Sequence, residues 1–407
     1  MKNRFFKYVS QNILAMIGLS LYILADTYFI SKAVGANGIT ALNMALPVYG
    51  VIFALGQMVG VGSAIRYSIV KEQYRNSNKD GSNECDKYFS GALFWGLVIG
   101  VIFAVLGLVF PDKIVEIMGG DETIVAIGVP YFRIFMSFSP FFIFNYTCNA
   151  FVRNDGNPSV SMAATLISSL FNIVFDYILM FPLGMGMPGA ALATALSPVV
   201  GVMICMIHFL SKKNTVKFKW FKTSLTRLFH CCQVGMSAFV GEMSGAVIVM
   251  VFNFIILRLT GNIGVAAYGV VANTALVAVA VFNGVALGSQ PLISESYGKH
   301  NIKDIKLIEK LGVATALGLA VIIVIMIWGF TDTIVGVFNS QGSDRLLSLA
   351  RVGLRIYFIG FLFAGINIFC SSALSAIASV KWAFVLSILK GFVVVNVCAA
   401  ILAPIFG

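Results

Sequence analysis

The sequence predicts an all-α, polytopic membrane protein in which two helical bundles form parallel repeats around a central cleft. Three observations support this fold class. Of the 407 residues, 59% are hydrophobic and only 11% are charged, whereas soluble domains carry about 25% charged residues. The apolar residues are gathered into stretches long enough to cross a bilayer, for which about 20 residues suffice. Finally, the second half of the chain repeats features of the first half.

We expect six membrane spans in the first half. Segments rich in breaker residues separate them: VGANG after the first span, FPDK after the third, RNDGNP after the fourth and FPLGMGMPG after the fifth. A polar, basic segment at 69–87 separates the second span from the third. Helices are expected because the bilayer core leaves backbone groups no partner but each other. The expected spans are 8–33, 40–68, 88–110, 124–152, 158–182 and 189–210.

The second half contains five expected spans, at 232–259, 264–290, 307–330, 347–377 and 381–404. RLTGNIG and NSQGSD mark two of the loops between them. The predicted domains are an N-terminal lobe at 1–210, a cytoplasmic linker at 211–231 and a C-terminal lobe at 232–407. The symmetry of the two halves predicts a twelfth span, which this sequence does not contain.

The distribution of Lys and Arg predicts the orientation. Most basic residues fall on one side of the predicted spans, including the N-terminus, the segment at 69–87 and the linker. Cytoplasmic loops carry such an excess, so we expect a multi-pass protein of the cytoplasmic membrane with a cytoplasmic N-terminus. The net charge of +11 is explained by these loops facing anionic lipid. We therefore expect the lipid bilayer and no nucleic acid as a partner, and a monomer.

An internal repeat links the halves. VGANGITA (34–41) aligns with TGNIGVAA (260–267), and the same offset of 226 places Gly62 on Gly288. RIFMSFSPFFIFNYTC (133–148) aligns with RIYFIGFLFAGINIFC (355–370) at an offset of 222. Six spans separate the matched helices, and an even number means that the two halves cross the membrane in the same direction. This is a parallel repeat, the arrangement of transporters that rock about a midplane site.

Two carboxylates within apolar stretches identify the candidate site. Asp26 and Asp176 each lie inside a predicted span, where an ionised acid costs roughly 2.5–3.5 kcal/mol on insertion scales. Asn172 precedes Asp176 by four residues and so shares its helix face, and Thr194 lies in the next span. Such residues usually mark an ion or substrate path. The alternative is that they pair with one another and join helices structurally.

The residue types leave the coupling ion open. Two carboxylates, one carboxamide oxygen and one hydroxyl suit Na⁺, because hard cations prefer several oxygen ligands. A proton needs only one carboxylate of raised pKa. The sequence contains no GxxxxGK[ST], GxSxG or HExxH motif and no paired-cysteine metal motif. We therefore expect neither an enzyme nor an organic cofactor, and transport driven by an ion gradient or a partner subunit.

Three further residues are candidates for substrate contact. Glu242 opens the seventh span, where an interfacial position is the alternative. Met136 and Phe141 lie in a stretch rich in Met and Phe that would suit flat cations through aromatic faces and polarisable sulfur. Packing against lipid is the alternative for most of that stretch.

Taken together, these segments resemble the MATE (multidrug and toxic compound extrusion) family. The similar segments are LYILADTYFI, RNDGNP, FNIVFDYILMFPLGMGMPGAALATALS and GSQPLISESYGKHN, so the resemblance covers almost the whole chain. Asn172 with Asp176 four residues later is similar to the DinF-like branch. That branch implies a cation site at Asp26, Asn172, Asp176 and Thr194. The resemblance also implies that Asn149 is a further polar position of the N-terminal lobe. Glu242 corresponds in this resemblance to a glutamate in the seventh span of NorM-like relatives.

The resemblance implies a cation-coupled antiporter, using Na⁺ or H⁺, that exports amphipathic and often cationic drugs. Drug and cation would compete for the carboxylates. A lipid-linked oligosaccharide flippase of the same broad superfamily is the alternative; it would need cations for pyrophosphate, whereas the candidates here are acidic. The chain departs from the family in three ways. Ser10-Gln11-Asn12 stands where relatives often carry a proline, Gly353-to-Ala378 contains no acid, and relatives have twelve spans.

Overall fold

The computed structural model describes residues 1–77, 81–221, 223–338 and 343–406, and these residues form helices joined by short loops. The N-terminal lobe contains α1 (Lys2–Ala33), α2 (Ala36–Asn76), α3 (Ser82–Val109), α4 (Pro111–Ile117), α5 (Glu122–Ser137), α6 (Ser139–Asn154), α7 (Pro158–Met180) and α8 (Gly186–Phe209). The C-terminal lobe contains α9 (Leu225–Gly298), α10 (Ile302–Phe338), α11 (Asp344–Ile359), α12 (Phe361–Ala376), α13 (Val380–Ile388), the π-helix η1 (Leu389–Val393) and α14 (Val394–Phe406).

The described helices confirm the predicted membrane spans. Nine helices are long and apolar enough to cross a bilayer, and two bent pairs bring the number to eleven. α9 contributes two spans, Leu225–Gly261 and Ile263–Gly298, which join at Gly261. Its first helical residue, Leu225, lies inside the segment that the sequence assigned to the linker, because Ser224 caps the helix by accepting the backbone N–H of Arg227.

Backbone geometry supports the internal repeat. Gly35 (φ 80°, ψ −155°) and Gly261 (φ 70°, ψ −160°) adopt the same conformation at corresponding positions, and a positive φ of this kind favours glycine. The two bent spans also correspond. α5 and α6 meet at Phe138 with a bend of 45°, and α11 and α12 meet at Gly360 with a bend of 46°. The two lobes are therefore repeats of one structural unit.

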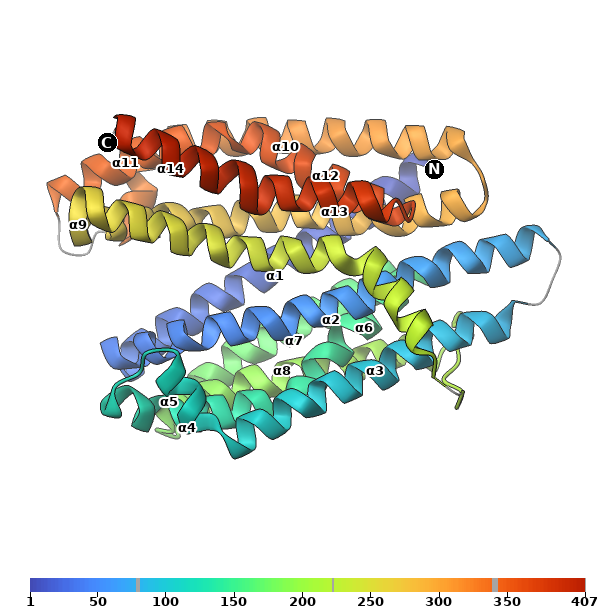
Figure 1. Cartoon of the computed structure of the whole chain (residues 1–407), viewed down its shortest axis with the longest axis horizontal. Coiled ribbons are helices and arrows are strands. Elements are labelled where there is room, and N and C mark those ends of the chain that lie inside the picture. Colours follow the sequence, from blue (N-terminus) through green and yellow to red (C-terminus); the bar gives the residue numbers. More distant parts are fainter. Residues whose placement is uncertain (78–80, 222, 339–342, 407) are drawn as a thin grey trace.

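The two lobes lie one above the other in Figure 1, with α1 crossing between them. α1 packs along α7 of its own lobe and along α9 of the other lobe. The N-terminus, the C-terminal end of α2 and the start of α9 gather at one end of the bundle, and α14 ends at the opposite end (Figure 1). We call the first of these the N-terminal end.

Glycines bring the lobes into backbone contact at the N-terminal end. A Cβ on Gly62 of α2 would lie 2.1 Å from the carbonyl oxygen of Cys231 in α9, and a Cβ on Gly235 would lie 2.0 Å from the carbonyl oxygen of Met58. The second half of α9 meets α1 in the corresponding way, since a Cβ on Gly288 would lie 2.7 Å from Cα of Val9. Gly62 and Gly288 are the residues that the repeat aligned, so both sides of this contact depend on the absence of a side chain.

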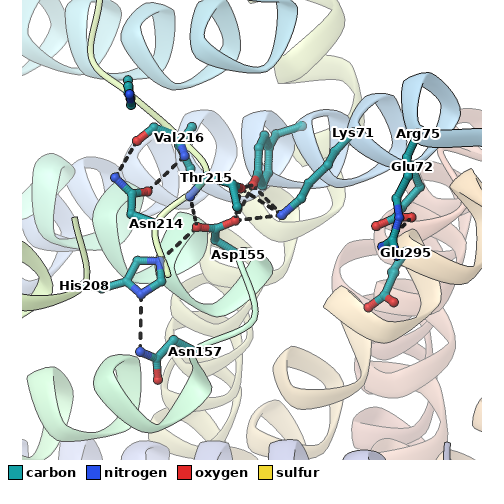
Figure 2. A network of polar contacts seen from close by, with 12 residues as sticks. Lys71, Glu72, Arg75, Asp155, Asn157, His208, Asn214, Thr215, Val216 and Glu295 are labelled. Carbon is teal, nitrogen blue, oxygen red and sulfur yellow. Dashed lines mark hydrogen bonds and ion pairs between the residues drawn. The ribbon is translucent and has the colours of Figure 1, made fainter. Parts of the chain in front are cut away.

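Ion pairs add to this contact between the lobes. Arg4 Nη2 of α1 lies 2.7 Å from Glu295 Oε2 of α9, and Lys299 pairs with the same glutamate. Lys299 Nζ also lies 3.8 Å from Glu72 Oε2 of α2, and Figure 2 shows Glu72 and Glu295 side by side. Partly exposed pairs contribute little individually, so the glycine contacts determine how closely the lobes approach.

A buried carboxylate fixes the linker to the N-terminal lobe (Figure 2). Asp155, in the turn after α6, accepts hydrogen bonds from the Tyr67 hydroxyl (2.5 Å), Lys71 Nζ (2.8 Å), the Thr215 backbone N–H (2.9 Å) and the Thr215 hydroxyl. His208 donates to it through Nε2 at 2.9 Å. Burial alone raises the pKa of Asp155, but the His208 hydrogen bond and the Lys71 charge outweigh it and hold the pKa well below its usual range.

We expect Asp155→Asn to lower the melting temperature of the purified protein by roughly 5–10 °C, because removing one partner leaves Lys71 without its counter-charge. Trypsin should then cut the released linker at Lys212 and Lys213 faster than in wild type. Asp112→Asn, at an exposed acid, is the matched control. Equal melting temperatures and equal cleavage rates in the two variants would contradict this role.

The same contact has a defined pH dependence. The folded-state pKa of Asp155 is lowered, so its stabilising effect is complete above the ordinary carboxyl pKa of about 3.9 and is lost as pH falls below that value. The difference in melting temperature between wild type and Asp155→Asn should therefore be constant from pH 5 to pH 8 and should shrink below pH 4. A difference that grew on acidification would be inconsistent with the lowered pKa.

Candidate cation site in the N-terminal lobe

One face of α7 is polar from end to end. Ser161, Ser168, Asn172 and Asp176 recur at helical spacing and are all buried, whereas the remaining faces of this helix are mostly apolar. A buried polar row needs polar neighbours, because an unsatisfied group inside a protein costs roughly 1–3 kcal/mol. α1 and α8 pack along α7 and supply them.

The structure places the four predicted site residues on these three helices. Asp26 of α1 is 7% exposed, Asp176 and Asn172 of α7 are fully buried, and Thr194 of α8 is 3% exposed. Asp26 is close enough to Asp176 for the two charges to interact. The fold thus brings together residues that are separated by as many as 168 positions in the chain (26 to 194).

Asn172 joins Thr194 to Asp176. In the amide orientation that satisfies its neighbours, its nitrogen donates to Asp176 Oδ2 at 3.1 Å. Its carbonyl oxygen then accepts from the Thr194 hydroxyl and backbone N–H, both at 3.3 Å. The carboxamide and the hydroxyl therefore bond to protein groups. One oxygen of each carboxylate, Oδ1 of Asp26 and Oδ1 of Asp176, has no hydrogen-bond partner among the described residues.

This arrangement suits a single small cation. Two carboxylates in a low-dielectric interior repel each other, and a shared proton or a bound monovalent cation removes that repulsion. Tyr22 of α1 and Tyr131 of α5 lie close enough to both acids to interact with their charges. Among the described residues, no group of three or more His, Cys, Asp or Glu side chains converges, so the oxygen set is too small for an all-carboxylate divalent-metal cage.

The secondary candidates lie in different surroundings. Asn149 of α6 is 9% exposed, donates to the backbone oxygen and Oδ1 of Asn145 at 2.9 Å each, and accepts from the Ser161 hydroxyl at 3.0 Å. Glu242 of α9 is exposed, and Tyr146 of the N-terminal lobe lies within its electrostatic range. Glu242 thus lies on the side of the C-terminal lobe that faces the other lobe, and Asn149 lies inside the N-terminal lobe.

The structure places Met136 and Phe141 in two different surroundings. Met136 is 2% exposed and packs at the contact between α5 and α3, where its side chain lies against Gly107. It belongs to the hydrophobic core because Gly107 leaves room for a long side chain there. Phe141 is 38% exposed and contacts the rings of Phe138 and Phe144. Neither Met136 nor Phe141 lines either of the two cavities described below.

Sequence reasoning missed the polar cavity inside the N-terminal lobe. This cavity, about 60 Å³ in volume, extends from Tyr22 beside the acids to Arg153 at the end of α6. The polar row on α7 was the signal that predicts it, since Thr165 and Ser168 line the cavity two turns and one turn before Asn172, respectively. A larger hollow of about 880 Å³ lies elsewhere, between α3, α8 and the linker, and none of the four site residues lines it.

The comparisons with known proteins agree with this architecture. A family model described as MatE matches residues 12–178 and 238–402. The multidrug export protein MepA of Staphylococcus aureus is 27% identical over 392 residues, which cover 94% of this chain and 84% of that protein. MepA of Staphylococcus saprophyticus is 25% identical over 382 residues, covering 93% of this chain and 82% of that protein.

A solved structure of a multidrug resistance MATE family transporter in an outward-facing conformation matches with a TM-score of 0.91 and 22% identity, covering 98% of this chain and 88% of that one. This likeness shows the fold, and the family model identifies the family. The resemblance inferred from the sequence is confirmed: the chain belongs to the MatE family of MATE transporters.

Proposed function

We propose that this chain exports amphipathic drugs, often cationic ones, by antiport with a monovalent cation, Na⁺ or H⁺. The relatives named as multidrug exporters support the substrate class. The observation that carries the coupling mechanism is the pair of unpartnered oxygens on Asp26 and Asp176. A buried acid pair that protein groups leave incomplete has a strong tendency to take up a cation.

Antiport requires that drug and cation stabilise different states, because a ligand shifts an equilibrium only through its differential affinity. In our proposal one cation binds the two carboxylates and reduces their combined charge from −2 to −1, so a cationic drug is attracted less strongly to the N-terminal lobe. The lobes are in contact at the N-terminal end, which we propose is the cytoplasmic end. In this state the drug would leave toward the opposite side.

The coupling ion is tested with the full chain reconstituted in liposomes. A Na⁺ gradient at equal pH and a pH gradient at equal Na⁺ are imposed separately, and the flux of a fluorescent cationic drug is recorded. We expect one of the two gradients to accelerate drug flux and the drug in turn to accelerate movement of that ion. If neither gradient changes the rate of drug flux, cation antiport is excluded.

A lipid-linked oligosaccharide flippase, the alternative function, would need a site of the opposite charge. A lipid pyrophosphate needs cations to bind it, whereas the site residues include two acids and no Lys or Arg. Competition experiments in the same liposomes distinguish the two functions, because a lipid-linked sugar should not inhibit drug flux in an exporter of cationic compounds.

A further inference from the structure

Arg153 is a buried cation without an acidic partner. It lies in the last turn of α6 and is only 5% exposed. Its Nη1 lies 3.4 Å from Asn12 Oδ1, its Nε has no hydrogen-bond partner, and it forms no ion pair with any described residue. A guanidinium stays charged in proteins. Burying a charge without a counter-charge costs several kcal/mol. A counter-charge is therefore missing.

The adjacent carboxylate cannot provide it. Asp155 follows Arg153 by two residues, but its two oxygens already accept hydrogen bonds from Tyr67, Lys71, His208 and Thr215. Lys71 compensates the charge of Asp155 at 2.8 Å. The positive charge of Arg153 is left over from this cluster.

Arg153 is one of the residues that line the polar cavity of the N-terminal lobe. The cavity has a volume of about 60 Å³, and since one buried water needs roughly 10–15 Å³ of such space, several waters or a small ion fit inside. Amide and hydroxyl side chains from four helices surround the space, and Leu287 of the C-terminal lobe closes it. The lining residues with amide or aliphatic hydroxyl groups are Gln57, Asn145, Asn149, Thr165, Ser168, Ser169 and Ser197.

We propose that this cavity binds a small monovalent anion, chloride, against Arg153. The Asn149 amide and the Thr165 and Ser168 hydroxyls already donate to protein oxygens. The groups that can donate hydrogen bonds to an anion are therefore those of Gln57, Asn145, Ser169 and Ser197, and the guanidinium supplies the charge. Water alone would satisfy the hydrogen bonds of Arg153 but not its charge. Leu287 precedes Gly288, which packs on the α1 backbone, so the anion binds the form in which the lobes meet at the N-terminal end.

The first test measures thermal unfolding of the purified full chain while chloride replaces gluconate, with the Na⁺ concentration, pH and ionic strength held constant. We expect a saturable rise in melting temperature of about 2–4 °C in wild type. Arg153→Gln should abolish the rise. Arg133→Gln, which removes an exposed arginine, should retain it. Because Na⁺ and pH do not change and no drug is present, the result is independent of cation antiport.

Two further measurements keep the proposal testable if Arg153→Gln folds poorly. Arg153→Lys retains the charge, so it should retain a chloride-dependent rise at a higher chloride concentration. Crystals of wild type grown in bromide should show an anomalous peak within hydrogen-bond distance of the Arg153 guanidinium. The proposal would be overturned by equal melting temperatures of wild type in chloride and gluconate, or by a rise that persists in Arg153→Gln. Density at Arg153 without a bromide signal would also overturn it, because the cavity would then contain water.

Discussion

Replacing Asp176 by asparagine is expected to reduce gradient-driven drug efflux by about 5–150-fold, the range that corresponds to typical coupling free energies between two ligands. Asparagine keeps the shape of the side chain and its bond to Asn172 but removes the charge that both drug and cation require. Asp26→Asn should have an effect of the same order, because its unpartnered oxygen belongs to the same site. The measurement is efflux of a fluorescent cationic drug from cells and from liposomes.

The double variant provides the sharper version of this test. If the two carboxylates bind one cation together, the combined loss should be much smaller than the product of the single losses, as for residues that act as a unit. Asp112→Asn, at an exposed acid outside the site, should transport at the wild-type rate. Wild-type efflux in both Asp26→Asn and Asp176→Asn would eliminate the mechanism.

Stability measurements separate loss of coupling from loss of fold. Replacing a buried acid that lacks a full set of partners by a neutral residue is commonly neutral or stabilising. We therefore expect Asp176→Asn to unfold at the same temperature as wild type or at a higher one. A variant that both unfolds early and fails to transport would not bear on the mechanism, whereas a stable, inactive one supports it.

The second large effect is expected from Gly62→Ala. The added Cβ would lie 2.1 Å from the Cys231 carbonyl oxygen, and since both partners are backbone the lobes must separate at the N-terminal end. Overpacking costs about 1–3 kcal/mol, which corresponds to a roughly 5–150-fold shift away from the closed form. We expect drug efflux to fall and the buried thiol of Cys231 to react faster with a maleimide, measured by peptide mass spectrometry.

Gly50→Ala is the matched control for Gly62→Ala. It lies on the same helix, where an added Cβ meets no atom within 4 Å, so it should leave Cys231 labelling and efflux unchanged. Gly288→Ala tests the corresponding contact in the other lobe and should mimic Gly62→Ala. If Gly62→Ala and Gly50→Ala label Cys231 at the same rate, the glycine contact does not control the approach of the lobes.

The sequence by itself determined the fold class, the spans and the repeat. Bilayer thickness sets a length of about 20 apolar residues for each span, so composition and breaker residues reveal the spans without any knowledge of packing. The two glycines with matching positive φ, Gly35 and Gly261, follow from an alignment of short loop motifs. Asp26 and Asp176 were also predictable, because the cost of a buried charge makes any acid inside a span conspicuous.

Only the tertiary structure decided which polar residues meet and which large side chains face a cavity. The periodicity of an apolar helix cannot distinguish a side chain that packs on a glycine of the next helix from one that lines a pocket, and only the structure shows that Met136 packs on Gly107. The sequence also does not show that Arg153 lacks a counter-charge. Asp155 lies only two residues away, but the structure shows that it bonds to other groups, including Lys71 and His208. Pairing of charges in an interior depends on distances between helices, which no local pattern of residues encodes.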